Sequence, residues 1–231
     1  MIAENIAAIR TRMDDAARKA GRDPKEILLC AATKMNDADR VREAVAGGVD
    51  CCGENRVQEL TAKLADRAYD GVPVHFIGHL QTNKVRQVVG KVDLIQSVDR
   101  LELLACIEKE AAKQGIVQDI LLEINIGAEE SKSGFTAEEA PLIASSMAHY
   151  PHCRLRGLMA IPPVSEKPGD NCRFFAEIHR IAVDIRTKKY NNSSMEILSM
   201  GMTDDFEDAI ACGSTMIRVG TAIFGARDYS K

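Results

Sequence analysis

Apolar residues recur along this chain at two different spacings, and each spacing predicts its own kind of element. In the N-terminal segment they follow at intervals of three or four, at Ile2, Ile6, Ile9 and Met13, and Gly21 comes after them. That spacing places the side chains on one face of a helix, and glycine is common just past a helix end. We therefore predict an amphipathic N-terminal helix that ends before Gly21.

After this segment, short continuous apolar runs alternate with longer stretches of helical periodicity. The apolar runs are Ile27–Thr33, Asp50–Gly53, Val74–Gly78, Leu94–Val98, Ile120–Ile126, Leu155–Ala160, Met195–Ser199 and Met216–Val219. The helical stretches are Asp37–Ala46, Asn55–Ala68, Thr82–Val89, Arg100–Gln114, Ala137–Met147, Asp170–Lys188 and Asp204–Ala211. Buried parallel strands are continuous apolar runs, and amphipathic helices connect them. The alternation therefore predicts a parallel sheet covered by helices on its outer side.

Eight such units in about 200 residues predict an α/β fold, a single (β/α)8 TIM barrel with an extra N-terminal helix. One domain is expected over residues 1–231, because no Ser-, Pro- or Gly-rich linker divides the chain. The longest loop, Pro162–Asp170, suits a barrel loop. The alternative is a doubly wound open sheet, which usually carries a GxGxxG turn or a P-loop, and the sequence has neither motif.

Composition limits the kinds of partner. The formal net charge is −4, and Lys and Arg are scattered rather than gathered in runs, so neither a nucleic-acid surface nor a polybasic membrane patch is expected. No segment is apolar enough for an export signal or long enough to span a membrane. The seven cysteines are odd in number and form no CxxC pair, so we expect no metal site and a reducing compartment. Cytoplasmic localisation is predicted.

In barrels of this kind, chemistry takes place where strands end and βα loops begin. The residues at or just after the ends of the predicted strands are Lys34; Glu54 and Asn55; His79, Gln81 and Asn83; Ser97; Asn125; Met159; Ser199 and Thr203; and Arg218, Gly220 and Thr221. Because the ends of parallel strands share one rim, these mostly polar groups are expected to meet in a binding site.

Lys34 ends the first apolar strand, which places its amine at that rim. A lysine in a partly dry pocket has a lowered pKa and forms an imine with an aldehyde. Taken alone, however, Lys34 favours the alternative of a strand-end lysine that reaches solvent. His79 has no obvious carboxylate partner, so a binding or structural role is favoured over acid–base chemistry. Lys132 is expected as a second amine near the rim, and Asn55 as the cap of the helix that follows it.

The turn from the seventh strand into a helix suits a phosphate group. Thr203 is a natural N-cap, and Asp204 and Asp205 would then stand in the first turn. Free amides at a helix N-terminus bind phosphate. Taken alone, the segment favours an ordinary capped helix.

Arg218, Gly220 and Thr221 follow at the end of the eighth strand. Phosphate sites after strands seven and eight recur in such barrels, and glycine backbone and a hydroxyl suit one. An arginine buried at a strand end needs partners. A structural salt bridge with Glu54 or Asp204 is therefore the alternative interpretation of Arg218.

Taken together, these motifs resemble those of the pyridoxal phosphate homeostasis protein family, also described as YggS-like or proline synthase co-transcribed proteins. The matching blocks are Ala31-Ala32-Thr33-Lys34, Gly53-Glu54-Asn55, Ile77-Gly78-His79-Leu80-Gln81-Thr82-Asn83-Lys84, Ser131-Lys132-Ser133-Gly134-Phe135, Gly157-Leu158-Met159, Ser199-Met200-Gly201-Met202 and Arg218-Val219-Gly220-Thr221-Ala222-Ile223-Phe224-Gly225. They follow in order along nearly the whole chain, which makes the resemblance specific.

The resemblance implies a fold like the N-terminal domain of alanine racemase and one cofactor, pyridoxal 5'-phosphate, held as a Schiff base on Lys34. It also implies that Arg218 faces the pyridine nitrogen and that Thr203, Gly220 and Thr221 contact the phosphate. The residues predicted to bind the cofactor are Lys34, Asn55, Met200, Thr203, Arg218, Gly220 and Thr221. The family usually has serine at position 203, where threonine keeps the hydroxyl, and often a proline shortly after Lys34.

Two functions remain open for such a barrel. In the first, the protein buffers pyridoxal phosphate or delivers it, for instance to apo-enzymes, and has no catalytic residues. In the second, it is a small amino-acid racemase. Alanine racemases add a second domain and a catalytic tyrosine across a dimer. This chain has no room for such a domain, and no tyrosine stands at a predicted strand end among Tyr69, Tyr150, Tyr190 and Tyr229. With no second base for proton transfer, we predict a non-catalytic, monomeric carrier. A cofactor-independent aldolase is a distant third alternative.

Overall fold

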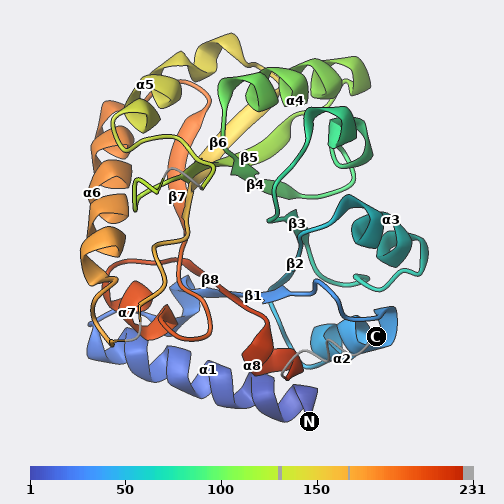
Figure 1. The fold of residues 1–231 in the computed structure, drawn as a ribbon, viewed down its shortest axis with the longest axis vertical. Coiled ribbons are helices and arrows are strands. Elements are labelled where there is room, and N and C mark those ends of the chain that lie inside the picture. Colours follow the sequence, from blue (N-terminus) through green and yellow to red (C-terminus); the bar gives the residue numbers. More distant parts are fainter. Residues whose placement is uncertain (130–131, 166, 226–231) are drawn as a thin grey trace.

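The computed structural model describes residues 1–129, 132–165 and 167–225, so that Ser131 and Tyr229 lie outside the described residues. Eight parallel strands close into a barrel in chain order (Figure 1), which confirms the predicted fold and rules out the open sheet. The strands are β1 (Leu28–Ala32), β2 (Cys51–Glu54), β3 (Val74–Phe76), β4 (Leu94–Val98), β5 (Gln118–Ile124), β6 (Cys153–Ala160), β7 (Ser193–Ser199) and β8 (Met216–Val219). Each begins and ends within two residues of the predicted run.

Helices cover the outside of the barrel, as the amphipathic stretches predict. The α-helices are α1 (Ile2–Lys19), α2 (Ala38–Ala46), α3 (Val57–Ala65), α4 (Leu101–Gln114), α5 (Glu139–Ser146), α6 (Cys172–Lys188), α7 (Phe206–Ala211) and α8 (Thr221–Phe224), with 3-10 helices at Pro24–Glu26, Thr82–Gln87 and Met147–His149. The α-helix predicted after β3 is thus a 3-10 helix, because its residues include the weak helix formers Thr82, Asn83 and Val85. In the described ranges, no helix is long and apolar enough to cross a membrane.

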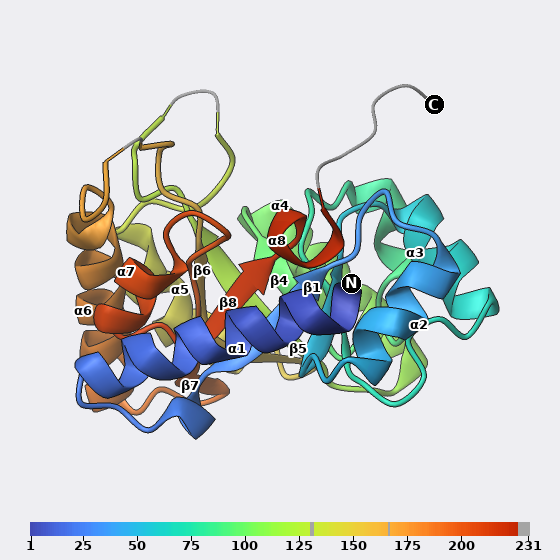
Figure 2. The same ribbon diagram turned by 90° about the horizontal axis from the view of Figure 1, so that it is seen from below.

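Helix α1 lies outside the barrel and packs along α7, α8 and α2 (Figures 1 and 2). It ends at Lys19, and Gly21 follows with a φ of 69°, a left-handed conformation that suits glycine. The predicted N-terminal helix and its stop are therefore confirmed. Helix α8 has only four residues, so α1 occupies the part of the outer layer that a longer final helix would fill.

Side chains alternate along each strand between the outer core and the barrel interior. On β1, Leu29 belongs to the main core outside the barrel wall, whereas Cys30 contacts Cys51 and Met216 inside the barrel. Counting on by twos from Cys30 brings Lys34 to the inner side of the rim. The period of the strand thus sets the direction of the residue that matters most for the predicted chemistry.

Candidate functional site

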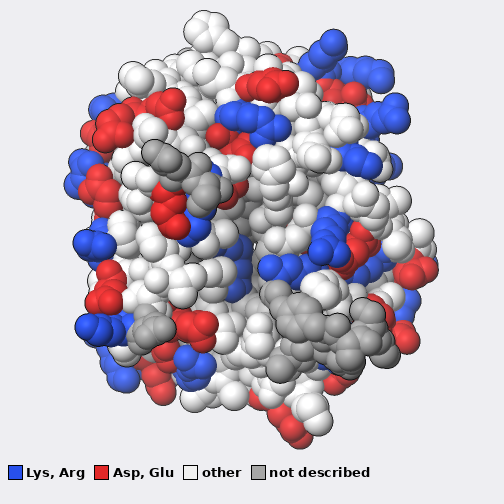
Figure 3. Space-filling view, viewed as in Figure 1, with Lys and Arg blue, Asp and Glu red and all other residues white. Residues whose placement is uncertain are grey.

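Adjacent strands of the barrel carry most of the residues predicted to bind the cofactor. β8 and β2 flank β1, and Cys30 on β1 lies opposite Arg218 on β8. Asn55 and Gly220 come directly after β2 and β8, and Lys34 is the second residue after β1, so closure of the barrel brings early and late parts of the chain to one rim. Figure 3 shows Lys and Arg side chains around the hollow at the centre of this face.

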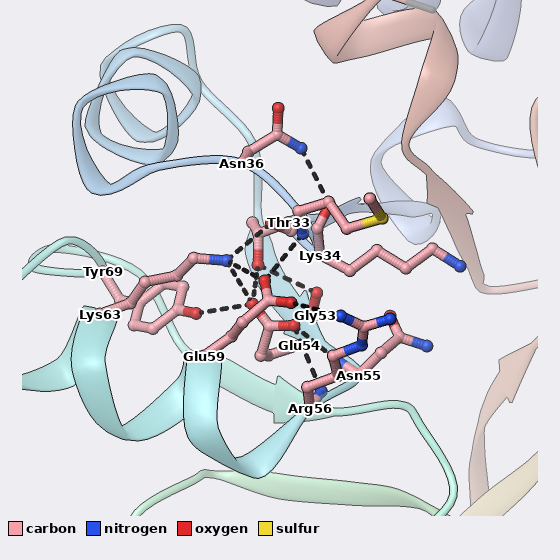
Figure 4. Close-up of polar contacts among 11 residues, drawn as sticks. Thr33, Lys34, Asn36, Gly53, Glu54, Asn55, Arg56, Glu59, Lys63 and Tyr69 are labelled. Carbon is pink, nitrogen blue, oxygen red and sulfur yellow. Dashed lines mark hydrogen bonds and ion pairs between the residues drawn. The ribbon is translucent and has the colours of Figure 1, made fainter. Parts of the chain in front are cut away.

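A tight turn after β1 sets the direction of Lys34 (Figure 4). Met35 has a φ of 61°, and its amide donates to Glu59 Oε2 at 2.7 Å. The Asn36 side chain donates to the Lys34 carbonyl at 3.1 Å. Left-handed backbone is uncommon for residues other than glycine. The hydrogen bond from Met35 to Glu59 on α3 therefore stabilises a backbone conformation that is unfavourable for methionine. The Lys34 side chain extends away from α3, on the same side as Asn55 (Figure 4).

Behind this turn lies a buried ion-pair network contributed by α3 (Figure 4). The Lys63 amine, in a residue only 6% exposed, lies 2.6 Å from Glu54 Oε2, 3.0 Å from Glu59 Oε2 and 2.8 Å from the Thr33 carbonyl. The Tyr69 hydroxyl adds a bond to Glu54 at 3.3 Å. Buried charges are tolerated when they are paired and hydrogen-bonded. The network ties the ends of β1 and β2 to α3, and it is not recognisable from the sequence because Lys63 looks like a solvent-facing helix residue.

Asn55 does not cap α3, contrary to the prediction. The helix begins at Val57 with Arg56 at the N-cap position, and this cap makes no side-chain hydrogen bond. The backbone N–H of Asn55 donates to Glu54 Oε1 at 2.7 Å. Its Oδ1 atom is buried and has no hydrogen-bond partner among the described residues. An unsatisfied buried acceptor costs free energy, so this atom suits contact with a bound donor.

Arg218 lies inside the barrel and is 5% exposed. Its Nη1 donates to the Ser199 carbonyl and to Ser199 Oγ, both at 2.6 Å, and its Nη2 donates to the Ala160 carbonyl at 3.1 Å. Within the described ranges it forms no ion pair, and Glu54 belongs to the network behind the rim, so the salt-bridge interpretation with Glu54 or Asp204 is wrong. Burial lowers the pKa of Arg218, and nearby negative charges oppose that effect.

Thr203 is not the N-cap of α7. The helix begins at Phe206 with Asp205 at the cap, so Asp204 and Asp205 precede the first turn instead of forming it. Asp205 Oδ1 accepts from the Met202 amide at 2.7 Å, and this turn delays the start of the helix. In the described part of the chain the Thr203 hydroxyl forms no hydrogen bond. The ordinary-cap interpretation is therefore wrong, and the hydroxyl is available to a ligand.

Glycines allow close backbone approach at the same rim. Gly201 has a φ of 95°, and a Cβ there would lie 2.6 Å from the Ala209 Cβ. Gly220 stands at the cap of α8, against Ala32, and the helix begins at Thr221. The first amides of a helix have no acceptor within it. The end of β8 therefore presents helix amides and the Thr221 hydroxyl where the sequence predicts a phosphate contact.

Met200 is placed differently from the other residues predicted to bind the cofactor. Its side chain is fully buried in the main core outside the barrel wall, while the preceding Ser199 points inward to Arg218. The Met200 amide donates to the Met216 carbonyl at 3.1 Å. The Met200 side chain therefore packs in the core, and the structure does not bring it together with the other residues predicted to bind the cofactor.

His79 has a carboxylate partner, so the interpretation that it lacks one is wrong. Its Nδ1 lies 3.1 Å from Asp99 Oδ2, and Arg100 Nη1 lies 2.5 Å from the other oxygen of Asp99. The His79 side chain is 56% exposed and that of Asp99 is 2% exposed. The pair escapes sequence inspection because Asp99 follows β4, 20 residues further along the chain. Together they place an oriented imidazole at the rim.

Strand β5 contributes a carboxyl group, Glu123, that is also absent from the predicted site. Burial raises the pKa of Glu123 to about 7; the charge of Asp99 acts in the same direction and that of Arg218 opposes it. Carboxyl groups that titrate near neutral pH are candidates for ligand contact or proton transfer. The sequence does carry a sign of this group, because Glu123 is the charged residue in the otherwise uncharged run Ile120–Ile126.

The remaining candidates have other partners or positions. Lys132 Nζ forms an ion pair with Glu129 Oε1 at 2.5 Å. Tyr150 and Tyr190 precede β6 and β7, at the end of the barrel opposite the rim. Tyr69 is held by the network behind the barrel wall. The structure describes these three tyrosines, and none of the three is at the rim.

Comparison with known proteins gives this arrangement a family. Residues 4–228 match the family model of the alanine racemase N-terminal domain. The chain is 42% identical over 234 residues to the pyridoxal phosphate homeostasis protein of Escherichia coli strain K12, covering 100% of this chain and 98% of that protein. Identity to the Pseudomonas aeruginosa protein of the same name is 41% over 229 residues, with 99% and 96% covered. PipY of Synechococcus elongatus PCC7942, solved with PLP bound, has a TM-score of 0.83 at 30% identity, covering 97% of this chain and 100% of that one. The chain therefore belongs to the pyridoxal phosphate homeostasis proteins, a family built on the alanine racemase N-terminal domain.

Proposed function

We propose that this protein binds pyridoxal 5'-phosphate at the rim of the barrel and holds it for cofactor homeostasis, by buffering or delivery, without catalysing turnover. The observation that carries the proposal is the arrangement of Lys34, Arg218 and the start of α8 at the ends of neighbouring strands. An amine, a buried guanidinium and helix amides match the aldehyde, the ring nitrogen and the phosphate of this cofactor.

The side chains fit this ligand chemically. Arg218 keeps its Nε–H and one Nη2–H without an acceptor among the described residues, which suits an unprotonated pyridine nitrogen. Asn55 Oδ1 is a buried acceptor that still needs a donor. When bound, the cofactor supplies an aldehyde that reacts with amines and a ring that withdraws electrons.

Each end of the ligand has a proposed holder. Lys34 would bind the aldehyde covalently as a Schiff base, so that the ring lies inside the rim. Gly220 and Thr221 would hold the phosphate through the start of α8, and the Thr203 hydroxyl would add a further contact. We assign Met200 no side-chain contact, because its side chain lies outside the barrel wall.

Two observations favour a carrier over a small amino-acid racemase. The relatives described above are named homeostasis proteins rather than enzymes. A racemase needs a base on each face of the α-carbon, and Lys34 can serve only one of them. We propose that the protein acts in the cytoplasm as a single-domain monomer and passes its cofactor to apo-enzymes that require it. The racemase alternative rests on the His79–Asp99 pair, which orients an imidazole at the rim.

The test is covalent trapping by borohydride, followed by peptide mapping. In the intact protein we expect the pyridoxyl group on Lys34, together with loss of the visible absorption band. Lys34→Ala should abolish both the band and the trapping, although phosphate-anchored binding of the cofactor should persist weakly. Lys132→Ala is the matched control, because it removes another amine near the rim and should leave trapping unchanged. Labelling confined to Lys132 or Lys84 would contradict the assignment.

A further inference from the structure

Inside the barrel, three side chains with the chemistry of metal ligands face one another. The Sγ atoms of Cys30 and Cys51 and a ring nitrogen of His75 all lie within 4.8 Å of one another, and all three residues are buried. They stand on the neighbouring strands β1, β2 and β3. In the sequence they are 21 and 24 residues apart, so no CxxC-like spacing marks them. Barrel closure, not local spacing, brings these atoms together.

We propose that Cys30, Cys51 and His75 form a binding site for one thiophilic cation of the zinc(II) or copper(I) kind. Thiolate sulfur and imidazole nitrogen are ligands that both ions prefer. Around one ion, with bonds of roughly 2.0–2.3 Å, such ligand atoms stand about 3.5–4 Å apart. Small side-chain rotations therefore suffice to bring the present atoms onto one centre. The site departs from the expectation of no metal, which rested on the lack of a CxxC pair.

Met216 offers a fourth ligand. It packs against Cys30 and Cys51 inside the barrel, and its Sδ lies 3.2 Å from Gln96 Nε2. A thioether is a soft ligand that suits copper(I), whereas zinc(II) usually takes thiolate, imidazole, carboxylate or water. The contribution of Met216 therefore distinguishes the two ions.

The charges around the cluster are compatible with an ion. Cys30 on β1 is the register partner of Arg218 on the adjacent strand β8. Two thiolates neutralise zinc(II) and leave one negative charge with copper(I), so neither loaded site would add positive charge beside the buried guanidinium.

Gln96 lies where it could accept the outer hydrogen bond that metal-bound histidines donate. His75 Nδ1 lies 2.9 Å from Gln96 Nε2, and Gln96 Oε1 accepts from Ser199 Oγ at 2.6 Å. With the Gln96 amide turned over, its oxygen would accept a hydrogen bond from Nδ1–H, its NH2 group would donate to Ser199 Oγ, and the other ring nitrogen would be left for the ion. The same contacts continue from Ser199 to Arg218, so they connect the proposed metal site to the rim.

The experiment is a metal titration of the purified full chain, reduced and freed of metal by a chelator. We expect about one equivalent of Co²⁺, a spectroscopic substitute for Zn²⁺, to bind with thiolate charge-transfer absorption and to be displaced by Zn²⁺. A parallel titration measures Cu⁺ in competition with a chromophoric chelator. Cys30→Ser and Cys51→Ser should each weaken binding by roughly 100-fold or more, because a thiolate ligand is lost. Met216→Leu should weaken Cu⁺ binding more than Zn²⁺ binding.

A matched control uses the other neighbouring thiols of the described chain, Cys172 and Cys212. The Cys172→Ser/Cys212→Ser variant should bind the metal like the unaltered protein. His75→Gln is a second ligand variant, and thermal unfolding together with cofactor absorption shows that each variant is folded. The proposal is overturned if neither ion binds the reduced protein at a ratio near one. It is equally overturned if binding survives in Cys30→Ser/Cys51→Ser or is lost in the Cys172→Ser/Cys212→Ser control.

Discussion

Thr203 has a hydroxyl that the protein does not use for its own structure, since α7 begins at Phe206. If the hydroxyl contacts phosphate, Thr203→Ala removes a charge-assisted hydrogen bond worth about 1.5–3 kcal/mol. Affinity for pyridoxal phosphate should then fall by about one to two powers of ten, while affinity for unphosphorylated pyridoxal stays nearly the same. Absorbance titrations with the two ligands measure this difference. Equal losses for both would exclude Thr203 from the phosphate contact.

A second prediction at the residue scale concerns Glu123. Burial raises its pKa from the ordinary value of 4.5 to about 7. Over that interval the folded protein keeps a proton that the unfolded chain has lost, so the free energy of unfolding decreases as pH rises through it. Glu123→Gln removes the dependence and should stabilise the cofactor-free protein by about 1–3 kcal/mol above pH 7. Urea unfolding at about pH 4.5 and pH 8 measures it. A pH-independent difference between the variants would refute this ionisation behaviour.

Among the elements, the buried ion-pair network of Lys63, Glu54 and Glu59 ties the ends of β1 and β2 to α3. Lys63→Met leaves Glu54 buried without its cation, which should cost about 3–5 kcal/mol of stability. Adding Glu54→Gln should recover part of the loss, because the uncompensated charge is then gone. Lys188→Met is the control: its exposed pair with Asp184 should contribute little. Urea unfolding of the four proteins tests this, and a Lys63→Met loss no larger than the control would mean that Glu54 is solvated.

Element boundaries also show what the sequence can and cannot predict. The runs Leu94–Val98 and Met216–Val219 agree with β4 and β8 at both ends, because every residue of these strands is buried and apolar residues stand at their first and last positions. Helix starts are less predictable. Thr203 and Asn55 are residue types that favour N-caps, yet neither caps a helix, because local hydrogen bonds such as that between Met202 and Asp205 compete for the turn.

At the scale of the whole molecule, barrel closure decides which distant residues meet. Strand ends alone indicate Lys34 and Arg218, since every strand must end at a shared rim. Pairs such as His79 with Asp99, and Cys30 with His75, depend on the register of neighbouring strands and on side-chain direction. Hydrophobic periodicity carries no information about such pairing. The fold is therefore largely predictable from this sequence, whereas only the strand-end members of the candidate site are.

Whether the whole molecule acts as a carrier or as an enzyme depends on a second base for proton transfer. A racemase removes the α-proton of an amino acid and returns one to the opposite face. His79 is the rim group best oriented for this, but its 56% exposed side chain leaves it open to water. We expect cofactor-loaded protein, incubated with single-enantiomer amino acids in deuterated water, to give no racemisation and no α-deuterium incorporation beyond that of free pyridoxal phosphate. Chiral chromatography and NMR measure both. Catalytic exchange with turnover would contradict the carrier function. If His79→Ala and Asp99→Asn then abolished it while Lys132→Ala did not, His79 would be the second base and the protein a small racemase.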